Sequence, residues 1–212
     1  HNIRTKNFEW ESSFNISSNF NKLLELSGEE RLISTGERNE TYLAQVGKRA
    51  ISFFGYKTDG IYKSQEEVDA VPHLASAVPG SLRIVDIKDR TEIGNPFPTA
   101  TWGFTNTLTW KGFDLYVMIQ GVHGLDVFNG DGYFTETKKF NRNYVKNRWI
   151  SADYPGDGKT PSFAANGGVA WEFTDYLIED GSYVALRNVT LGYKFNKKQL
   201  KKIGISSLRL YA

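Results

Sequence analysis

The sequence contains no cysteine, which excludes disulfide frameworks, thiol catalysis and cysteine-based metal sites. No apolar run approaches the roughly 18–20 residues of a membrane-spanning helix, so helical membrane proteins are excluded as well. Neither sign of charge dominates: 26 Lys and Arg against 24 Asp and Glu give a net charge of +2, and we expect no nucleic-acid partner. No basic and apolar leader begins at His1, so we expect any export signal to be removed or to lie outside this chain.

Residue types that carry chemistry are sparse. The three histidines are scattered and form no HExxH motif or other closely spaced ligand pair. Asp175, Glu179 and Asp180 lie close together, but solvated carboxylates are a better interpretation than a glycosidase pair, which is defined by separation in space. Residues 129–132 and 156–160 are too incomplete for a calcium loop or a phosphate loop. We therefore predict no catalytic residue, no cofactor, no metal site and no enzymatic activity.

Aromatic residues are abundant, since they make up 14% of a chain in which hydrophobic residues make up only 40%. Apolar and polar side chains alternate in four stretches, residues 8–18, 102–110, 113–120 and 188–195. A period of two places successive side chains on opposite faces of a strand. These stretches therefore predict strands with one apolar and one polar face.

The connections between the predicted strands are of two kinds. The Trp-Lys-Gly-Phe sequence of residues 110–113 predicts a tight hairpin, because glycine can adopt positive φ. Weaker strands are expected near 23–33 and 205–212. By contrast, the connections at about 34–97 and 123–182 are long and rich in Gly, Pro, Asp and Asn. Loops beyond about 12–15 residues are uncommon in compact domains and are usually functional.

Outer-membrane barrels have this alternation of short periplasmic turns and long external loops. The physical reason is that no unpaired backbone can lie in hydrocarbon, so elaboration is confined to the ends of the strands. The predicted fold is therefore all-β: antiparallel strands of a transmembrane β-barrel, partial and of about six strands, with two long extracellular loops. Residues 1–212 are treated as one architectural unit.

A secreted carbohydrate-binding β-sandwich is the alternative, because its strands also alternate, with the apolar face turned to a core. The barrel is favoured because the polar faces carry mostly small side chains and the long loops follow every second strand. Ser12, Asn106 and Arg187 are unfavourable for a lipid-facing surface, and Arg187 is tolerated only near an interface. A sandwich would seal four apolar side chains that a barrel leaves exposed, namely Trp110, Phe113, Leu115 and Leu191.

The connection at 123–182 is rich in aromatic residues. A loop of this composition either packs on itself as a small domain or binds a ligand or a partner protein, and the sequence leaves both possibilities open. The aromatic residues are Phe128, Tyr133, Phe134, Phe140, Tyr144, Trp149, Tyr154, Phe163, Trp171, Phe173 and Tyr176.

Five groups of motifs in the sequence are similar to motifs of one protein family. GYKTDGIYKSQEEV at 55–68 is similar to the family's "GyxtdGiyqsxeEv", and PGSLR at 79–83 to the "PGdlr" that follows it. IGNPFP with WGFTN resembles "iGnpxPxxxyGftn", and WKGFDL with QGVHG resembles "ykgfDLsvfxqGvxG". EDGSY with RNVTLGY resembles "edgSYlRlknvtLgY". The groups occur in the family's order across most of the chain, which thus resembles the SusC/RagA-type TonB-dependent outer-membrane transporters.

The resemblance implies an importer in the bacterial outer membrane, with a barrel of about twenty-two strands filled by a plug. It implies energy supplied by TonB through a plug that is not in this chain, a SusD-like surface lipoprotein as partner, and glycan or peptide oligomers as substrate. The chain would be an incomplete C-terminal part of that barrel, in contact with membrane lipid. Lys111 and Gly112 would form a periplasmic turn and 123–182 an extracellular loop. We expect Asp114, Tyr116 and Gln120 to face the lumen and the ligand.

The chain departs from the family at two positions. Residues 85–91 are a shorter stretch than the acidic "DvNgDGxIxxxDr" loop of the family, so no calcium-like site is carried over. Ala185 stands where the family motif has arginine.

Overall fold

The computed structural model describes residues 1–130, 142–162, 172–202 and 204–212. The chain divides into two compact units, each built from separate segments of the sequence. The sheet unit comprises His1–Asn19, Pro98–Gly124 and Gly181–Ala212. The loop unit comprises Phe20–Phe97 and Leu125–Asp180. Each unit is described by itself below.

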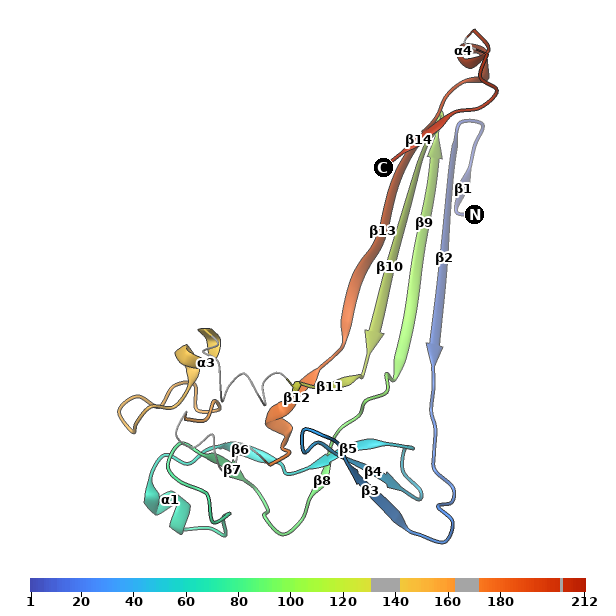
Figure 1. Cartoon of the computed structure of the whole chain (residues 1–212). Helices are drawn as coiled ribbons and strands as arrows, with labels where there is room; N and C mark the ends of the chain where they lie inside the picture. The colour runs from blue at the N-terminus through green and yellow to red at the C-terminus, as the bar shows by residue number, and fades with distance from the viewer. Residues whose placement is uncertain (131–141, 163–171, 203) are drawn as a thin grey trace. The chain divides into compact units, whose positions relative to one another are not determined.

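The sheet unit is one antiparallel sheet of six strands, in the order β1-β2-β9-β10-β13-β14. Its strands are β1 (Ile3–Arg4), β2 (Phe8–Ser18), β9 (Ala100–Trp110), β10 (Phe113–His123), β13 (Tyr183–Lys194) and β14 (Arg209–Tyr211). A short helix, α4 (Lys197–Lys201), lies between β13 and β14. The four long strands run side by side (Figure 1) and have 11 or 12 residues each, the length that a tilted strand needs to cross hydrocarbon. The predicted all-β fold with about six antiparallel strands is confirmed.

All short connections of this sheet lie at one end. The register pairs Phe8 with Trp110, Trp110 with Phe113 and Phe113 with Tyr193, so the ends of the four long strands are level. Lys111 and Gly112 close the β9–β10 hairpin with φ of 48° and 94°, the positive values that a two-residue hairpin turn requires. The chain leaves and re-enters the sheet at the opposite end.

The loop unit contains three small antiparallel sheets. One has the order β3 (Arg31–Thr35), β4 (Thr41–Gln45), β5 (Ser52–Gly55) and β8 (Thr91–Gly94), and the others pair β6 (Thr58–Ile61) with β7 (Leu82–Ile84) and β11 (Asp126–Phe128) with β12 (Ile178–Asp180). Its helices are α1 (Gln65–Asp69), α3 (Arg142–Asn147) and the 3-10 helix η3 (Asp175–Leu177). None of the helices within the described residues has the length and apolar composition to span a membrane.

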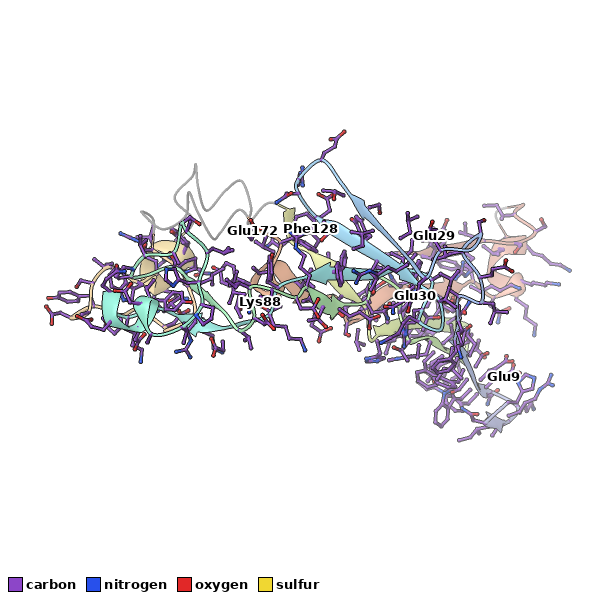
Figure 2. All side chains as sticks on the ribbon, turned by 90° about the horizontal axis from the view of Figure 1, so that it is seen from below. Glu9, Glu29, Glu30, Lys88, Phe128 and Glu172 are labelled. Carbon is purple, nitrogen blue, oxygen red and sulfur yellow. The ribbon has the colours of Figure 1, made fainter. Side chains whose placement is uncertain are left out.

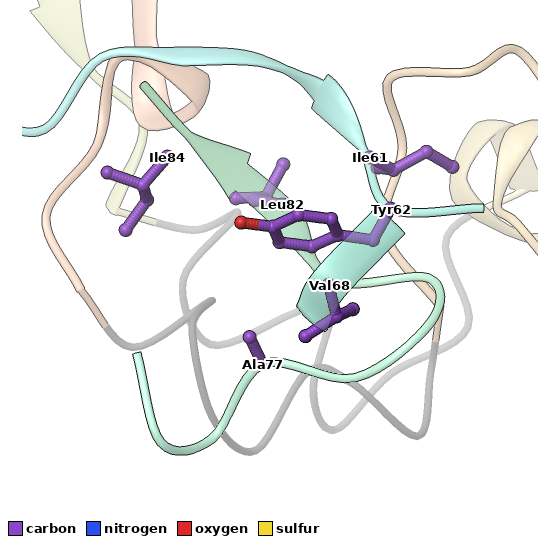
Figure 3. Close-up of a cluster of buried hydrophobic side chains, with 6 residues drawn as sticks. All are labelled: Ile61, Tyr62, Val68, Ala77, Leu82 and Ile84. Atoms are coloured by element: carbon purple, nitrogen blue, oxygen red, sulfur yellow. The ribbon is translucent and has the colours of Figure 1, made fainter. Parts of the chain in front are cut away.

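Two hydrophobic clusters hold the loop unit together. Figure 3 shows the first, in which the ring of Tyr62 lies among Ile61, Val68, Ala77, Leu82 and Ile84. Phe173 is the centre of the second cluster: it is 2% exposed, and its ring centroid lies 6.1 Å from that of Phe53 and 5.3 Å from that of Phe128, which is labelled in Figure 2.

Several aromatic side chains of the 123–182 connection therefore pack inside a folded unit. Tyr144 and Phe173 are buried, whereas Tyr154 is exposed. Trp149 and Tyr176 pack against the first cluster. The remaining aromatic residues lie outside the described residues; they are Tyr133, Phe134, Phe140, Phe163 and Trp171.

The strand expected near 23–33 is wrong in its bounds. Residues 23–30 contain no strand, because Ser27 and Gly28 turn the chain with φ of 48° and 92°. Residues 31–35 form β3, which pairs with β4 of the loop unit and not with β2. Instead, β2 pairs with β9 along its whole length. The segment between these two strands that belongs to the loop unit runs from residue 20 to residue 97.

Candidate functional site on the two faces of the sheet

One face of the six-stranded sheet collects the apolar side chains of every long strand. Across the sheet, Trp10 lies opposite Leu108, Leu108 opposite Leu115, and Leu115 opposite Leu191. The aromatic side chains gather toward the ends of this face: Phe113 and Tyr193 have ring centroids 4.6 Å apart at the hairpin end, and Phe14 and Trp102 lie 6.2 Å apart toward the other end. The face therefore has an apolar band between two groups of aromatic rings.

This apolar face is open. Trp110 is 52% exposed, Phe113 47%, Val189 51% and Leu191 54%. Trp110, Phe113 and Leu191 are three of the four side chains that a sandwich would bury in a sealed interior, and the fourth, Leu115, is partly exposed. Large apolar patches exposed on this scale mark surfaces that bind protein or lipid.

The two polar residues that interrupt the apolar face bind each other. Asn106 Oδ1 accepts a hydrogen bond from Trp10 Nε1 at 2.9 Å and another from Ser12 Oγ at 2.7 Å. Internal pairing of this kind is what a polar group needs in a medium that offers no water. Ser12 and Asn106, expected to be unfavourable toward lipid, are thus partnered within the sheet.

Arg187 does not belong to the apolar face. The pairing of β10 with β13 shifts between Met118 and Ile119, so Met118 faces Asn188 and Ile119 faces Leu186. This β-bulge leaves Arg187 as the extra residue, and its guanidinium donates to Gln120 Oε1 at 2.9 Å and to the Tyr183 hydroxyl at 3.0 Å, on the polar face. The expectation that Arg187 is lipid-facing is wrong, because the bulge changes the phase of alternation.

The polar face carries the three predicted ligand-facing residues, Asp114, Tyr116 and Gln120, at alternate positions of β10. Asp114 accepts two hydrogen bonds from Arg209, at 3.0 Å from Nε and 2.5 Å from a terminal nitrogen. Gly192 lies opposite Asp114, and a Cβ there would lie 2.6 Å from its carboxylate oxygens, so glycine makes room for this ion pair. Tyr116 lies between Thr107 and Thr190 in the register.

Sequence reasoning missed Arg187, Tyr183 and Arg209 as partners on this face. For Arg187 and Tyr183 a signal existed, because Val184 and Leu186 are apolar at even positions whereas Val189 and Leu191 are apolar at odd ones. For Arg209 there was none, since its register depends on how residues 195–208 return to the sheet.

The loop unit holds two further hollows lined by charged groups. A cavity of about 510 Å³ is bordered by Lys48 and Glu92, which form an ion pair at 3.8 Å, and by Asp126, whose carboxylate accepts from the Asn95 backbone N–H at 2.7 Å. A second, of about 420 Å³, is bordered by Asp59, Asp157 and Asp175, among others. Glu92, Asp126, Asp157 and Asp175 each bind a partner within the loop unit and so stabilise its fold.

The acidic residues examined as a glycosidase pair have structural partners too. Asp175 accepts from the Thr58 backbone N–H at 3.0 Å and from its hydroxyl at 2.7 Å. Glu179 accepts from the Asn129 amide at 2.5 Å. Asp175 thus fixes the start of β6, and Glu179 fixes the segment that follows β11.

Asp157 organises the turn before Thr160. Partial burial raises the pKa of its carboxyl, but hydrogen bonds from the backbone N–H groups of Thr160 and Lys159 and from the Thr160 hydroxyl outweigh that effect, so the pKa lies below its ordinary value. A carboxyl whose pKa is lowered by folding stabilises the folded state when the pH is above its unfolded-state pKa of about 3.9. This stabilisation is lost as the pH falls through the folded-state pKa.

We therefore expect Asp157→Ala to weaken protection of this turn by about 1–2 kcal/mol at neutral pH, because the N–H donors lose a charged acceptor. Amide hydrogen exchange at Lys159 and Thr160 measures the effect. The difference between the natural protein and the variant should shrink below about pH 4, where the carboxyl becomes protonated. A difference that stays constant down to pH 3 would contradict this role.

A single antiparallel sheet with an open apolar face, aromatic rings at its ends and a paired polar face has the construction of the wall of an outer-membrane β-barrel. No protein-family model matches the chain. The chain is 30% identical to TonB-dependent receptor P26 of Formosa agariphila, over 99% of its own length and 22% of the receptor. It is 25% identical to TonB-dependent receptor SusC of Bacteroides thetaiotaomicron, over 91% of its own length and 19% of SusC.

The fold agrees with these similarities. The structure of the RagAB peptide transporter superposes with a TM-score of 0.70, at 20% identity, over 99% of this chain and 23% of the transporter chain. The RagAB peptide importer in its open-open state gives a TM-score of 0.69 over 98% and 22%. The chain thus spans about a fifth of the length of the proteins it matches. The resemblance to SusC/RagA-type TonB-dependent transporters is confirmed, as is the partial outer-membrane β-barrel fold, and the protein is located in the bacterial outer membrane.

Proposed function

We propose that this chain is a barrel segment of a TonB-dependent importer of glycan or peptide oligomers that works with a SusD-like lipoprotein. The observation that carries the proposal is the sorting of the sheet into an open apolar face and a polar face with internally paired charges. Such a sheet suits hydrocarbon on one side and a wet lumen on the other. The relatives are named as receptors and transporters, which agrees with a role other than catalysis.

In this proposal, Asp114, Tyr116 and Gln120 line the path of the substrate. The Asp114–Arg209 and Gln120–Arg187–Tyr183 contacts hold polar groups in fixed positions along the path. A row of fixed hydrogen-bonding groups suits an oligomer, which offers hydroxyl or amide groups at regular spacing. Energy would come from TonB through a plug domain, and residues 34–97 and 123–182 would be extracellular.

A secreted carbohydrate-binding sandwich is disfavoured by the same observation. It would require a second sheet over the apolar face. Among the described residues of the sheet unit no second sheet is present, and Trp110, Phe113 and Leu191 are about half exposed.

The test is uptake by cells that produce the whole transporter containing this chain. Fluorescent oligosaccharides and peptides of graded length are supplied to cells with and without TonB. We expect TonB-dependent uptake of one class, reduced several-fold by Tyr116→Ala or Gln120→Ala at an unchanged amount of protein in the outer membrane. Ser13→Ala, at a small side chain of the same polar face, is the control expected to leave uptake unchanged. Uptake that is independent of TonB, or insensitive to both substitutions, would contradict the proposal.

A further inference from the structure

The short connections of the sheet bring three lysines to the same place. The Lys111 backbone N–H donates to the Asn7 carbonyl at 3.2 Å, and the Lys194 N–H donates to the Gly112 carbonyl at 2.8 Å. The β1–β2 turn, the β9–β10 turn and the end of β13 are therefore adjacent in the sheet unit. Lys6, Lys111 and Lys194 border one hollow of about 350 Å³ at this end.

This end of the sheet is basic. The connections 5–7, 111–112 and 195–208 contain no acidic residue, and their lysines are Lys6, Lys111, Lys197, Lys198, Lys201 and Lys202. Two carboxylates border the hollow, but Glu9 lies 3.7 Å from the Arg4 guanidinium and Asp114 is paired with Arg209. Within the described residues, Lys6, Lys111 and Lys194 take part in no ion pair, so their charge is available to an anion.

An apolar groove of about 360 Å³ adjoins the basic hollow on the same sheet. Its apolar lining is Phe8, Leu108, Trp110, Phe113, Leu115 and Leu191, and the hollow shares Phe8, Trp110 and Phe113 with it. The Lys111 ammonium lies 5.2 Å from the centre of the Trp110 ring, where the basic and apolar surfaces meet. The junction combines positive charge with an apolar groove.

We propose that this junction binds an anionic phospholipid of the periplasmic leaflet, with an acyl chain in the groove and the phosphate on Lys6 and Lys111, the lysines of the two turns. Lys194 pairs with Arg209 in the register and lies on the polar face. The inference rests on the proposed function, because the short connections of outer-membrane barrels face the periplasm. Basic clusters beside a membrane-spanning surface attract anionic headgroups, and each lysine adds to the attraction. The bound lipid would hold the ends of β2, β9, β10 and β13 at a fixed depth in the membrane.

The experiment uses the whole transporter, purified in mild detergent and exposed to equal amounts of phosphatidylglycerol and phosphatidylcholine. Native mass spectrometry counts the lipid retained on each barrel. We expect phosphatidylglycerol to be preferred, and Lys6→Gln and Lys111→Gln combined to weaken its retention at least tenfold. Lys57→Gln and Lys63→Gln combined, in the loop unit, remove the same charge and should leave retention unchanged. Excess inorganic phosphate should not displace the lipid, because phosphate cannot occupy the groove.

Three results would overturn the lipid site: equal retention of the two lipids, an equal loss in the control variant, or full displacement by inorganic phosphate. A failure of the proposed function would look different. It would leave the protein outside the outer-membrane fraction or its uptake independent of TonB, and both are measured without reference to bound lipid.

Discussion

Val189→Arg should sharply reduce the amount of folded protein in the outer membrane, whereas Asn188→Arg should not. The two residues are neighbours on β13, but they lie on opposite faces of the sheet: Val189 faces Val117 on the apolar side and Asn188 faces Met118 on the polar side. Val189 also lies near the middle of its strand and is 51% exposed, so an arginine there would meet hydrocarbon. The expected cost is about 2–4 kcal/mol, the range for arginine near the midplane of a barrel.

The measurement is folding of the whole transporter into lipid vesicles at a series of guanidinium concentrations. Folded barrel is scored by its altered mobility on unheated gels. Asn188→Arg adds the same charge and bulk one residue away, so it controls for both. Equal destabilisation by the two substitutions would show that the two faces of β13 do not contact different media. The sheet would then not be the wall of a transmembrane barrel.

The sequence predicted the sheet well because lipid and water impose a strict period of two. Residues 8–18, 102–110 and 113–120 keep one phase throughout, and each is a strand in the structure. Arg187 was misplaced because alternation assumes an unbroken pleat, whereas the bulge opposite Met118 and Ile119 inserts one residue. A phase change inside a strand is visible in the sequence only when both halves are long enough to define a phase.

The structure of the loop unit could not be predicted from alternation of apolar and polar residues. Its strands have three to five residues, too few to define a period. Its contacts join distant segments: Tyr56 pairs with Thr174, and Asp126 pairs with Asp180. Such pairings depend on packing around Phe173, and no local pattern in the sequence predicts that packing. The family resemblance marked this region as a loop, and the structure adds that the described part has a core.

The polar face of the sheet could be predicted in part. Alternation placed Asp114, Tyr116 and Gln120 together on one face of β10, as the structure does. It could not supply their partners, because Arg209 and Arg187 come from other strands whose register is set by a connection and by a bulge. Side chains that line one strand can therefore be predicted from the sequence, whereas contacts across strands require the register.

Phe173→Ala should unfold the loop unit locally while the sheet still assembles. The Phe173 ring is 2% exposed and packs against Phe53 and Phe128, and its backbone carbonyl accepts from the Tyr56 N–H at 2.9 Å. Truncating a buried phenylalanine costs about 3–5 kcal/mol, a large share of the 5–15 kcal/mol that stabilises a typical domain. Phe20→Ala is the control in the same unit: Phe20 is 77% exposed, and its loss should cost less than about 0.5 kcal/mol.

Hydrogen exchange and limited proteolysis of the whole transporter follow the two units separately. In Phe173→Ala, protection should fall in β5, β11 and η3, while the long strands of the sheet stay protected and the protein still reaches the outer membrane. The sheet should survive because its 11- and 12-residue strands are joined by their own hydrogen bonds and are stabilised by lipid on the apolar face. If Phe173→Ala abolished membrane assembly as fully as Val189→Arg, folding of the sheet would depend on the core of the loop unit, and the two units could not be treated as separate in stability.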